Sequence, residues 1–292
     1  MVWDWIIALY LFLAGLGAGA FIFAALLKPE LKKLRLGAMI IALVAVAVGT
    51  VMLMVDARAG FANPVRFFYL VSNLSSVMAW GVVLLSLFLI VAFIDCILVG
   101  VKKKTVRALD IAGAVLALGV ATYTGVLLGV SMVYPLWNIV VLPILFVVSA
   151  LSSGFAAVGL YGFASAKDEL AQVSFKPKAS IVLPILEAVL IIALLVVTMN
   201  AGGYAAEAGR ASVAAIISGS YAVTFWIGVI ALGIVLPLVL EIAATGRIKA
   251  ARKEGKDQPG ARGFAALADA SVVLGAFCLR CVIVLAAVAI IL

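Results

Sequence analysis

The sequence contains no histidine, and only three of its 292 residues are cysteine. Without histidine, the usual axial ligands of a b-type haem and the imidazole ligands of a zinc centre are missing. Three cysteines are also fewer than the four thiolates that hold an iron–sulfur cluster. No phosphate-binding segment of the form G-x-x-x-x-G-K-[ST] is present either. We therefore predict a protein that holds no haem and no metal and does no nucleotide-driven work.

Two of the cysteines, Cys278 and Cys281, form a C-x-x-C pair close to the end of the sequence. Such a pair suits a redox couple or half of a metal site. It also suits two small apolar side chains on a buried helix, which free cysteine resembles physically. The lack of a second pair favours the packing interpretation.

Charged residues are also scarce, and the sequence contains long apolar runs. Only 12% of the residues are charged and 67% are hydrophobic, with a mean hydropathy of +1.34. Soluble domains have about 25% charged and roughly 45–50% apolar residues. Several runs exceed ~18 residues without alternation, which predicts membrane-spanning helices and not a barrel. The first run is too long for a cleavable signal peptide and carries Asp4 near its start.

Apolar runs of about 20 residues predict one polytopic membrane domain over 1–292 with eight spans. The predicted spans are 5–27, 37–55, 71–98, 109–132, 139–164, 180–200, 213–243 and 264–290. Seventeen of the 21 lysines and arginines fall in the odd-numbered loops, which explains the net charge of +8 without nucleic acid. The positive-inside rule then places those loops in the cytoplasm and both termini outside.

Three ionisable residues lie well inside the predicted spans: Glu187, Asp269 and Arg280. A charge in the hydrocarbon costs at least ~2.5–3.5 kcal/mol, so each needs a reason to be there. One interpretation is a proton relay between an aqueous side and a buried site. The other is structural pairing, for example of Glu187 with Arg280. Asp269 and Arg280 are eleven residues apart, about three turns, so both can face the same way.

Asp95, Asp110 and Glu241 lie nearer the cytoplasmic ends of their spans. There, structural pairing or snorkelling of the side chain toward water is the simpler interpretation. At the opposite ends, aromatic residues such as Trp137, in the turn from Tyr134 to Asn138, are expected to anchor the helices at the membrane edge.

The first span carries small residues four apart, including Gly15 and Gly19. This spacing permits close helix packing. The missing side chains could also leave room for a planar ring, and the two interpretations are compatible.

Several segments spread along the sequence together resemble the NrfD/polysulfide reductase (PsrC-like) membrane subunit family. They are VWDWIIALYLFLAGLGAGAF at 2–21, PVRFFYLVSNLSSVMAWG at 64–81, the strings YTGVLLG, PLWN, LPILF and SALSSG within 123–154, LE at 186–187 and CLRCVIV at 278–284. The resemblance implies two four-helix bundles in the bacterial cytoplasmic membrane. It also implies menaquinone or ubiquinone as the electron carrier, a ferredoxin-like [4Fe–4S] subunit on the outer face and a molybdopterin catalytic subunit beyond it.

The same resemblance implies roles for particular residues. Tyr123 is expected to donate a hydrogen bond to the quinone, although a backbone carbonyl one turn away would also satisfy its hydroxyl. Tyr10, Arg66, Asn73 and Gly15 are expected in the pocket or at its mouth.

The resemblance places Glu187 and Arg280 on a polar path through the second bundle, and Asp269 is expected to join them. Some relatives carry a polar or histidine side chain where this first span offers Ala14 and Gly15, so the contacts of the quinone ring differ here.

The sequence thus predicts a quinone-reactive membrane anchor of a respiratory oxidoreductase. Two other functions remain open: an ion or small-molecule transporter, for which the buried charges would form the pathway, and a purely structural anchor with no quinone of its own.

Overall fold

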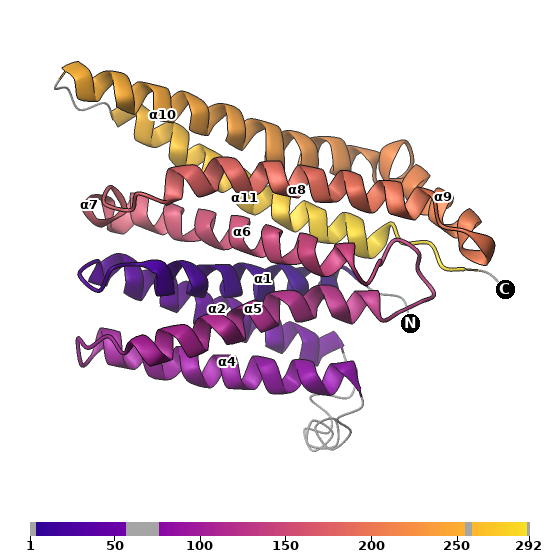
Figure 1. Ribbon diagram of the computed structural model, residues 1–292, viewed down its shortest axis with the longest axis horizontal. Helices are drawn as coiled ribbons and strands as arrows, with labels where there is room; N and C mark the ends of the chain where they lie inside the picture. The colour runs from indigo at the N-terminus through magenta and orange to yellow at the C-terminus, as the bar shows by residue number, and fades with distance from the viewer. Residues whose placement is uncertain (1–3, 57–75, 255–258, 291–292) are drawn as a thin grey trace.

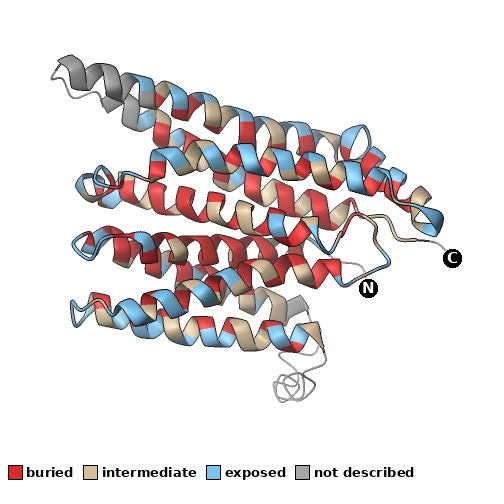
Figure 2. Cartoon of the chain, in the orientation of Figure 1, coloured by how far each residue is buried: buried red, intermediate tan, exposed pale blue. Residues whose placement is uncertain are grey.

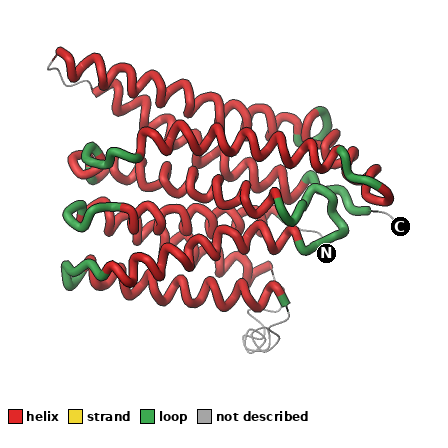
Figure 3. The backbone as a smooth tube through the Cα atoms, viewed as in Figure 1, coloured by secondary structure: helices red, strands yellow, loops and turns green. Residues whose placement is uncertain are grey.

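The computed structural model describes residues 4–56, 76–254 and 259–290. Within these ranges every regular element is a helix (Figure 3). The prediction of an all-α membrane protein is confirmed.

Eight helices in the described ranges are long and apolar enough to cross a membrane. They are α1 (Trp5–Leu26), α2 (Lys32–Asp56), α4 (Val77–Gly100), α5 (Arg107–Gly129), α6 (Val141–Ser165), α8 (Lys176–Met199), the wide π-helical segment η2 (Thr224–Val235) continued by α10 (Leu236–Glu254), and α11 (Pro259–Leu285). Three short elements join them: α7 (Lys167–Leu170), η1 (Gly203–Ala205) and α9 (Ala206–Ile217).

The seventh predicted span, 213–243, begins too early. The backbone leaves helix α9 after Ile217, turns through 218–220, and starts the long helix only near Thr224. Apolar residues continue on both sides of this Ser-Gly-Ser turn, so hydropathy alone merges two helices into one span.

The last predicted span, 264–290, ends too late, because α11 stops at Leu285. Beyond it the backbone N–H of Val288 donates to Oγ of Ser212 at 2.9 Å, and that of Ile290 donates to the carbonyl of Val133 at 2.9 Å. These residues are as apolar as a helix interior, but tertiary hydrogen bonds replace the helical ones.

Helix α1 lies at the centre of the molecule. It packs against α2, α5, α6 and α11, and most of its side chains are buried (Figure 2). The glycines of α1 make this possible. A Cβ added to Gly19 would overlap the backbone of Ala150 on α6, and one added to Gly154 would overlap the backbone of Gly19. The close packing predicted from the small-residue spacing is therefore present.

The outward faces of the spans are apolar. On α4, for example, Ile90, Phe93 and Ile94 are exposed, and on α8 so are Val182, Ile185 and Ile192. A continuous apolar perimeter of this kind suits lipid and not water.

The connections gather at two ends. Loops 27–31, 101–106 and 166–175 share the end that carries α7, here named the basic end because most of the described loop lysines lie there (Figure 1). The start of α1, the turn 130–140, α9 and the segment after α11 share the other, here named the termini end. The side of the membrane that each end faces, and the division into two four-helix bundles, stay predictions.

Candidate functional site

Two phenols lie buried together near the termini end. Tyr10 of α1 is fully buried and Tyr123 of α5 nearly so, and the two are close enough to interact electrostatically. Tyr10 stands five residues after Trp5, and Tyr123 six before Gly129. At 1.5 Å per residue both are roughly 8–9 Å along their helices from that end.

The position of Tyr123 depends on a glycine of the neighbouring helix. A Cβ added to Gly81 of α4 would overlap the ring and hydroxyl of Tyr123. The phenol therefore lies directly against the α4 backbone, with little freedom to rotate away from Tyr10.

The hydroxyl of Tyr10 has no hydrogen-bond partner among the described residues. A buried hydroxyl without a partner destabilises a protein by about 1–3 kcal/mol, so it normally meets a protein group, water or a ligand. A phenol can donate to a carbonyl oxygen, and the two adjacent phenols thus suit a carbonyl-bearing ring. Arg66 and Asn73, which the family resemblance places in the quinone pocket or at its mouth, lie outside the described residues.

Gly15 does not join the phenols. A Cβ added to it would lie 3.4 Å from Nη2 of Arg280 and 3.4 Å from the Cβ of Ala150. Five residues separate Gly15 from Tyr10, which turns the helix by about 140°. Helix α1 therefore presents Tyr10 on one face and leaves room for Arg280 on another.

Arg280 of α11 is a buried cation held by one residue of α6. Its guanidinium lies 3.8 Å from the ring centroid of Phe146, and its Nη2 donates to the carbonyl of Phe146 at 3.3 Å. Nε and Nη1 have no hydrogen-bond partner in the described part of the molecule. Two donors are thus available to a buried anion, water or hydroxyl.

Glu187 of α8 is the acidic residue that interacts with Arg280. It is buried, and it is close enough to Arg280 to interact with it electrostatically. Within the described residues, ion pairs at 4.0 Å or less join Arg35 to Asp110 and Lys176 to Asp269. Glu187 and Arg280 are not joined in this way, so their interaction acts over a longer distance.

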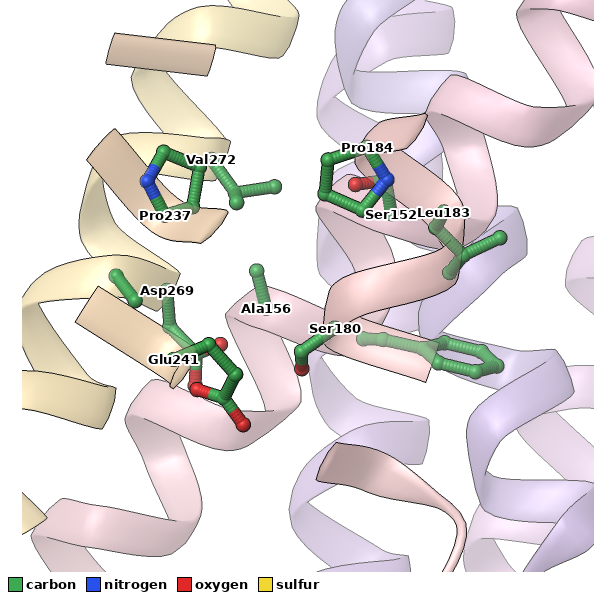
Figure 4. Close-up of a pocket in the computed structure, with 11 residues that line it drawn as sticks. Ser152, Ala156, Ser180, Leu183, Pro184, Pro237, Glu241, Asp269 and Val272 are labelled. Carbon is green, nitrogen blue, oxygen red and sulfur yellow. The ribbon is translucent and has the colours of Figure 1, made fainter. Parts of the chain in front are cut away.

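Asp269 forms a separate group with Lys176 and Glu241. Nζ of Lys176 lies 3.0 Å from Oδ1 and 2.9 Å from Oδ2 of Asp269, and all three side chains are buried. Figure 4 shows Glu241 of α10 and Asp269 of α11 facing Ser180 of α8 across a small cavity. Its volume of about 10 Å³ leaves room for roughly one water molecule.

These groups follow one face of α8. Lys176, Ser180 and Glu187 are separated by four and seven residues, which brings them onto the same side of a helix. From the start of α8 to Glu187 the rise is roughly 16 Å. Polar side chains of α8 and the water-sized space beside Ser180 thus lie between the basic end and the middle of the molecule.

Comparison with known proteins identifies the family. Residues 1–291 match the family described as polysulphide reductase, NrfD. The protein belongs to the NrfD family.

Three curated relatives are similar over most of their lengths. The C subunit of polysulfide reductase from Wolinella succinogenes is 35% identical over 283 residues, covering 85% of this sequence and 86% of that protein. Protein NrfD homolog of Haemophilus influenzae is 29% identical, covering 96% and 92%, and protein NrfD of Escherichia coli is 31% identical, covering 82% and 84%. An eight-span membrane protein of this family is consistent with the membrane subunit of a respiratory oxidoreductase.

In this NrfD-family protein the predicted site residues divide into three groups. Tyr10 lies beside Tyr123, Gly15 and Glu187 lie near Arg280, and Asp269 lies with Lys176. Cys278 and Cys281 are free and partly buried. A Cβ added to Gly228 would lie 2.6 Å from Sγ of Cys278, so that thiol is closely packed.

Sequence reasoning missed Lys176 and assigned Trp137 the wrong role. In the sequence Lys176 looks like one more basic loop residue, but it is buried and paired with Asp269. The available signal was its spacing of eleven residues from Glu187, which puts both on one face of the helix. Trp137 was expected to anchor the helices in the membrane interface; it is buried within the protein, its Nε1 donates to the carbonyl of Ile283 at 2.9 Å, and its ring lies 4.1 Å from that of Tyr134. The anchor role predicted for Trp137 is wrong, because the indole ties the turn to α11.

Proposed function

We propose that this protein is the quinone-reactive membrane subunit of a respiratory oxidoreductase complex in the bacterial cytoplasmic membrane. Menaquinone or ubiquinone, when bound, supplies a membrane-soluble carrier of two electrons and two protons. The observation that carries the proposal is the pair Tyr10 and Tyr123, buried together at one end of the spans, with the hydroxyl of Tyr10 unpartnered among the described residues. Family membership supports it, because the Wolinella succinogenes relative is named as one subunit of a polysulfide reductase.

The phenols bind and orient the ring. Tyr10 donates a hydrogen bond to the quinone from α1, and Tyr123 donates one from α5, where its ring lies in close contact with Gly81. The family resemblance alone assigns Arg66 and Asn73 to the mouth of this site, since both lie outside the described residues. Both phenols belong to the buried apolar core, which also contains Leu127 and Leu128; such a core excludes water and strengthens these hydrogen bonds.

Proton movement is assigned to the polar groups along α8. Lys176 and Asp269 form an ion pair towards the basic end, and Glu241 and Ser180 border the water-sized cavity beside it. Glu187 accepts or releases a proton in the middle of the molecule, where it is close enough to Arg280 to interact with it electrostatically. Arg280 keeps two donors for this exchange that no described residue occupies.

The electron partner is proposed to dock on the termini end. The phenol pair lies roughly 8–9 Å along its helices from that end. A ferredoxin-like [4Fe–4S] subunit docked there would therefore be separated from the quinone by only a short distance through the protein. A molybdopterin catalytic subunit beyond it would complete the complex.

The test is quinol oxidation by the assembled complex carrying Tyr123→Phe, with Tyr161→Phe as the matched control. Tyr161 is a phenol of α6 that packs on Gly37, away from the pair. Losing one hydrogen bond worth about 1.4 kcal/mol lowers turnover roughly tenfold. We expect that loss for Tyr123→Phe and normal turnover for Tyr161→Phe. Equal turnover of the two variants removes Tyr123 from the site.

A transporter is the second candidate, favoured by the buried Lys176–Asp269–Glu241 group and its cavity. Proteoliposomes containing this protein alone separate the two functions. Substrate or ion flux without quinol supports transport. If the purified complex contains no bound quinone and the protein alone shows no flux, the remaining function is a purely structural anchor.

A further inference from the structure

A second buried charge cluster lies outside the groups described above, at the basic end of α2, α4 and α5. It consists of Arg35, Asp95 and Asp110, each exposed by 1% or less. Arg35 stands three residues into α2, Asp110 three into α5 and Asp95 five before the end of α4. All three are thus within roughly 5–8 Å of the basic end along their helices.

Arg35 is committed to Asp110. Its Nη2 forms a short ion pair with Oδ1 of Asp110, and its Nη1 donates to the carbonyl of Leu27 at 3.4 Å. The nearby Arg107 donates to the carbonyl of Ala25 at 3.0 Å. The cluster therefore holds one fixed positive charge, and Asp110 neutralises it.

Asp95 then has no counter-charge left in this cluster. Neither of its oxygens accepts a hydrogen bond from a described residue, and the same holds for Oδ2 of Asp110. The two carboxyls nevertheless lie within hydrogen-bonding reach of one another. The groups that face Asp95 are Asp110 of α5, Arg35 of α2 and, on α4 itself, the thiol of Cys96.

Two adjacent carboxyls in a water-poor site do not both ionise, because their like charges repel and neither is solvated. An ionised Asp95 would be a buried anion without a single donor from the described residues. A protonated Asp95 resolves both problems, since its O–H can donate to the free oxygen of Asp110.

We propose that Asp95 and Asp110 bind one proton between them, with Arg35 as the fixed counter-charge. The site is distinct from the groups along α8, and it stands whether or not Tyr10 and Tyr123 bind a quinone. Its ligand is a proton taken from the basic end. It gives the α1–α2–α4–α5 side of the molecule a protonatable group of its own.

Infrared absorption of the purified full-length protein in H₂O and D₂O tests this directly. A protonated carboxyl shows a C=O stretch that shifts in D₂O, and an ionised carboxylate does not. Asp95→Asn leaves Asp110 alone with Arg35, and Asp110→Asn leaves Asp95 alone with Arg35. We therefore expect either variant to lose the absorption of one carboxylic acid per protein molecule. If one variant fails to fold, the other still tests the proposal.

Asp168→Asn is the matched control, because Asp168 is an exposed aspartate at the same end. It should lose only carboxylate absorption and keep the whole carboxylic acid band. The proposal is overturned if Asp95→Asn and Asp110→Asn behave like Asp168→Asn. It is equally overturned if added sodium removes the acid band from the wild-type protein, since the site would then bind a metal cation.

Discussion

At the scale of single residues, the buried charges of this protein fall into groups with different neighbours. Arg280 stacks on Phe146 and keeps two donors that no described residue occupies, whereas Lys176 and Arg35 are each joined directly to an aspartate. The directly joined cations are therefore expected to stabilise the fold. Arg280, with unused donors beside Glu187, is expected to matter more for proton exchange than for stability.

Lys176→Met tests the stabilising role. The change leaves Asp269 buried without its partner, and breaking a buried ion pair in this way costs about 3–5 kcal/mol. Lys178→Met is the matched control, because Lys178 is exposed two residues away and should change stability by less than about 0.5 kcal/mol. Thermal unfolding of both variants in detergent micelles gives the comparison. Similar midpoints for the two would contradict a stabilising Lys176–Asp269 pair.

Sequence reasoning reached some of these residues and not others, for a physical reason. Glu187 and Arg280 are conspicuous because a charge within an apolar run needs compensation. Lys176 and Arg35 lie at helix ends, where a loop lysine or arginine looks the same as a buried one. Their pairing depends on which helices are neighbours, and the sequence does not state this.

At the scale of the helices, glycines set how closely the central helix packs. A Cβ added to Gly19 of α1 would overlap the backbone of Ala150, whereas a Cβ added to Gly15 of the same helix would lie 3.4 Å from its nearest neighbours. The two positions look alike in the sequence as small residues four apart. Only the register of α6 against α1 distinguishes them.

Gly19→Ala and Gly15→Ala are therefore a matched pair. A methyl group at Gly19 must push α1 and α6 apart, and overpacking of this kind costs about 1–3 kcal/mol. At Gly15 the methyl group fits, so stability should change by less than about 0.5 kcal/mol. Thermal unfolding in detergent micelles measures both. Equal destabilisation would contradict the α1–α6 contact.

The helix boundaries show the same limit of sequence reasoning. The existence of eight spans follows from apolar length, since backbone groups in lipid must be satisfied within a helix. Apolar length does not predict the turn at 218–220 or the end of α11 at Leu285, because the sequence stays apolar across both. Tertiary hydrogen bonds, such as that from Val288 to Ser212, decide those boundaries.

At the scale of the whole molecule, the protein has a basic end and a termini end (Figure 1). The predicted orientation puts the basic end in the cytoplasm. It also puts the phenol pair near the outer face and the cluster of Arg35, Asp95 and Asp110 near the inner face.

Cysteine labelling tests that orientation. Gly202→Cys adds a side chain at the termini end, where nothing lies within 4 Å of the new Cβ, and Lys102→Cys adds one in an exposed loop at the basic end. A membrane-impermeant maleimide applied to spheroplasts should label Gly202→Cys and spare Lys102→Cys until the cells are opened. The reverse pattern would invert the proposed topology and move the partner to the other face.

Quinone binding by the purified complex tests the central claim most directly. Titration with a quinol should show saturable binding to the wild-type protein and to Tyr161→Phe. Tyr10→Phe removes the unpartnered donor from α1, and the loss of one hydrogen bond worth about 1.4 kcal/mol raises the Kd roughly tenfold. Absence of saturable binding in the wild type, or an unchanged Kd in Tyr10→Phe, would contradict a quinone site at Tyr10 and Tyr123.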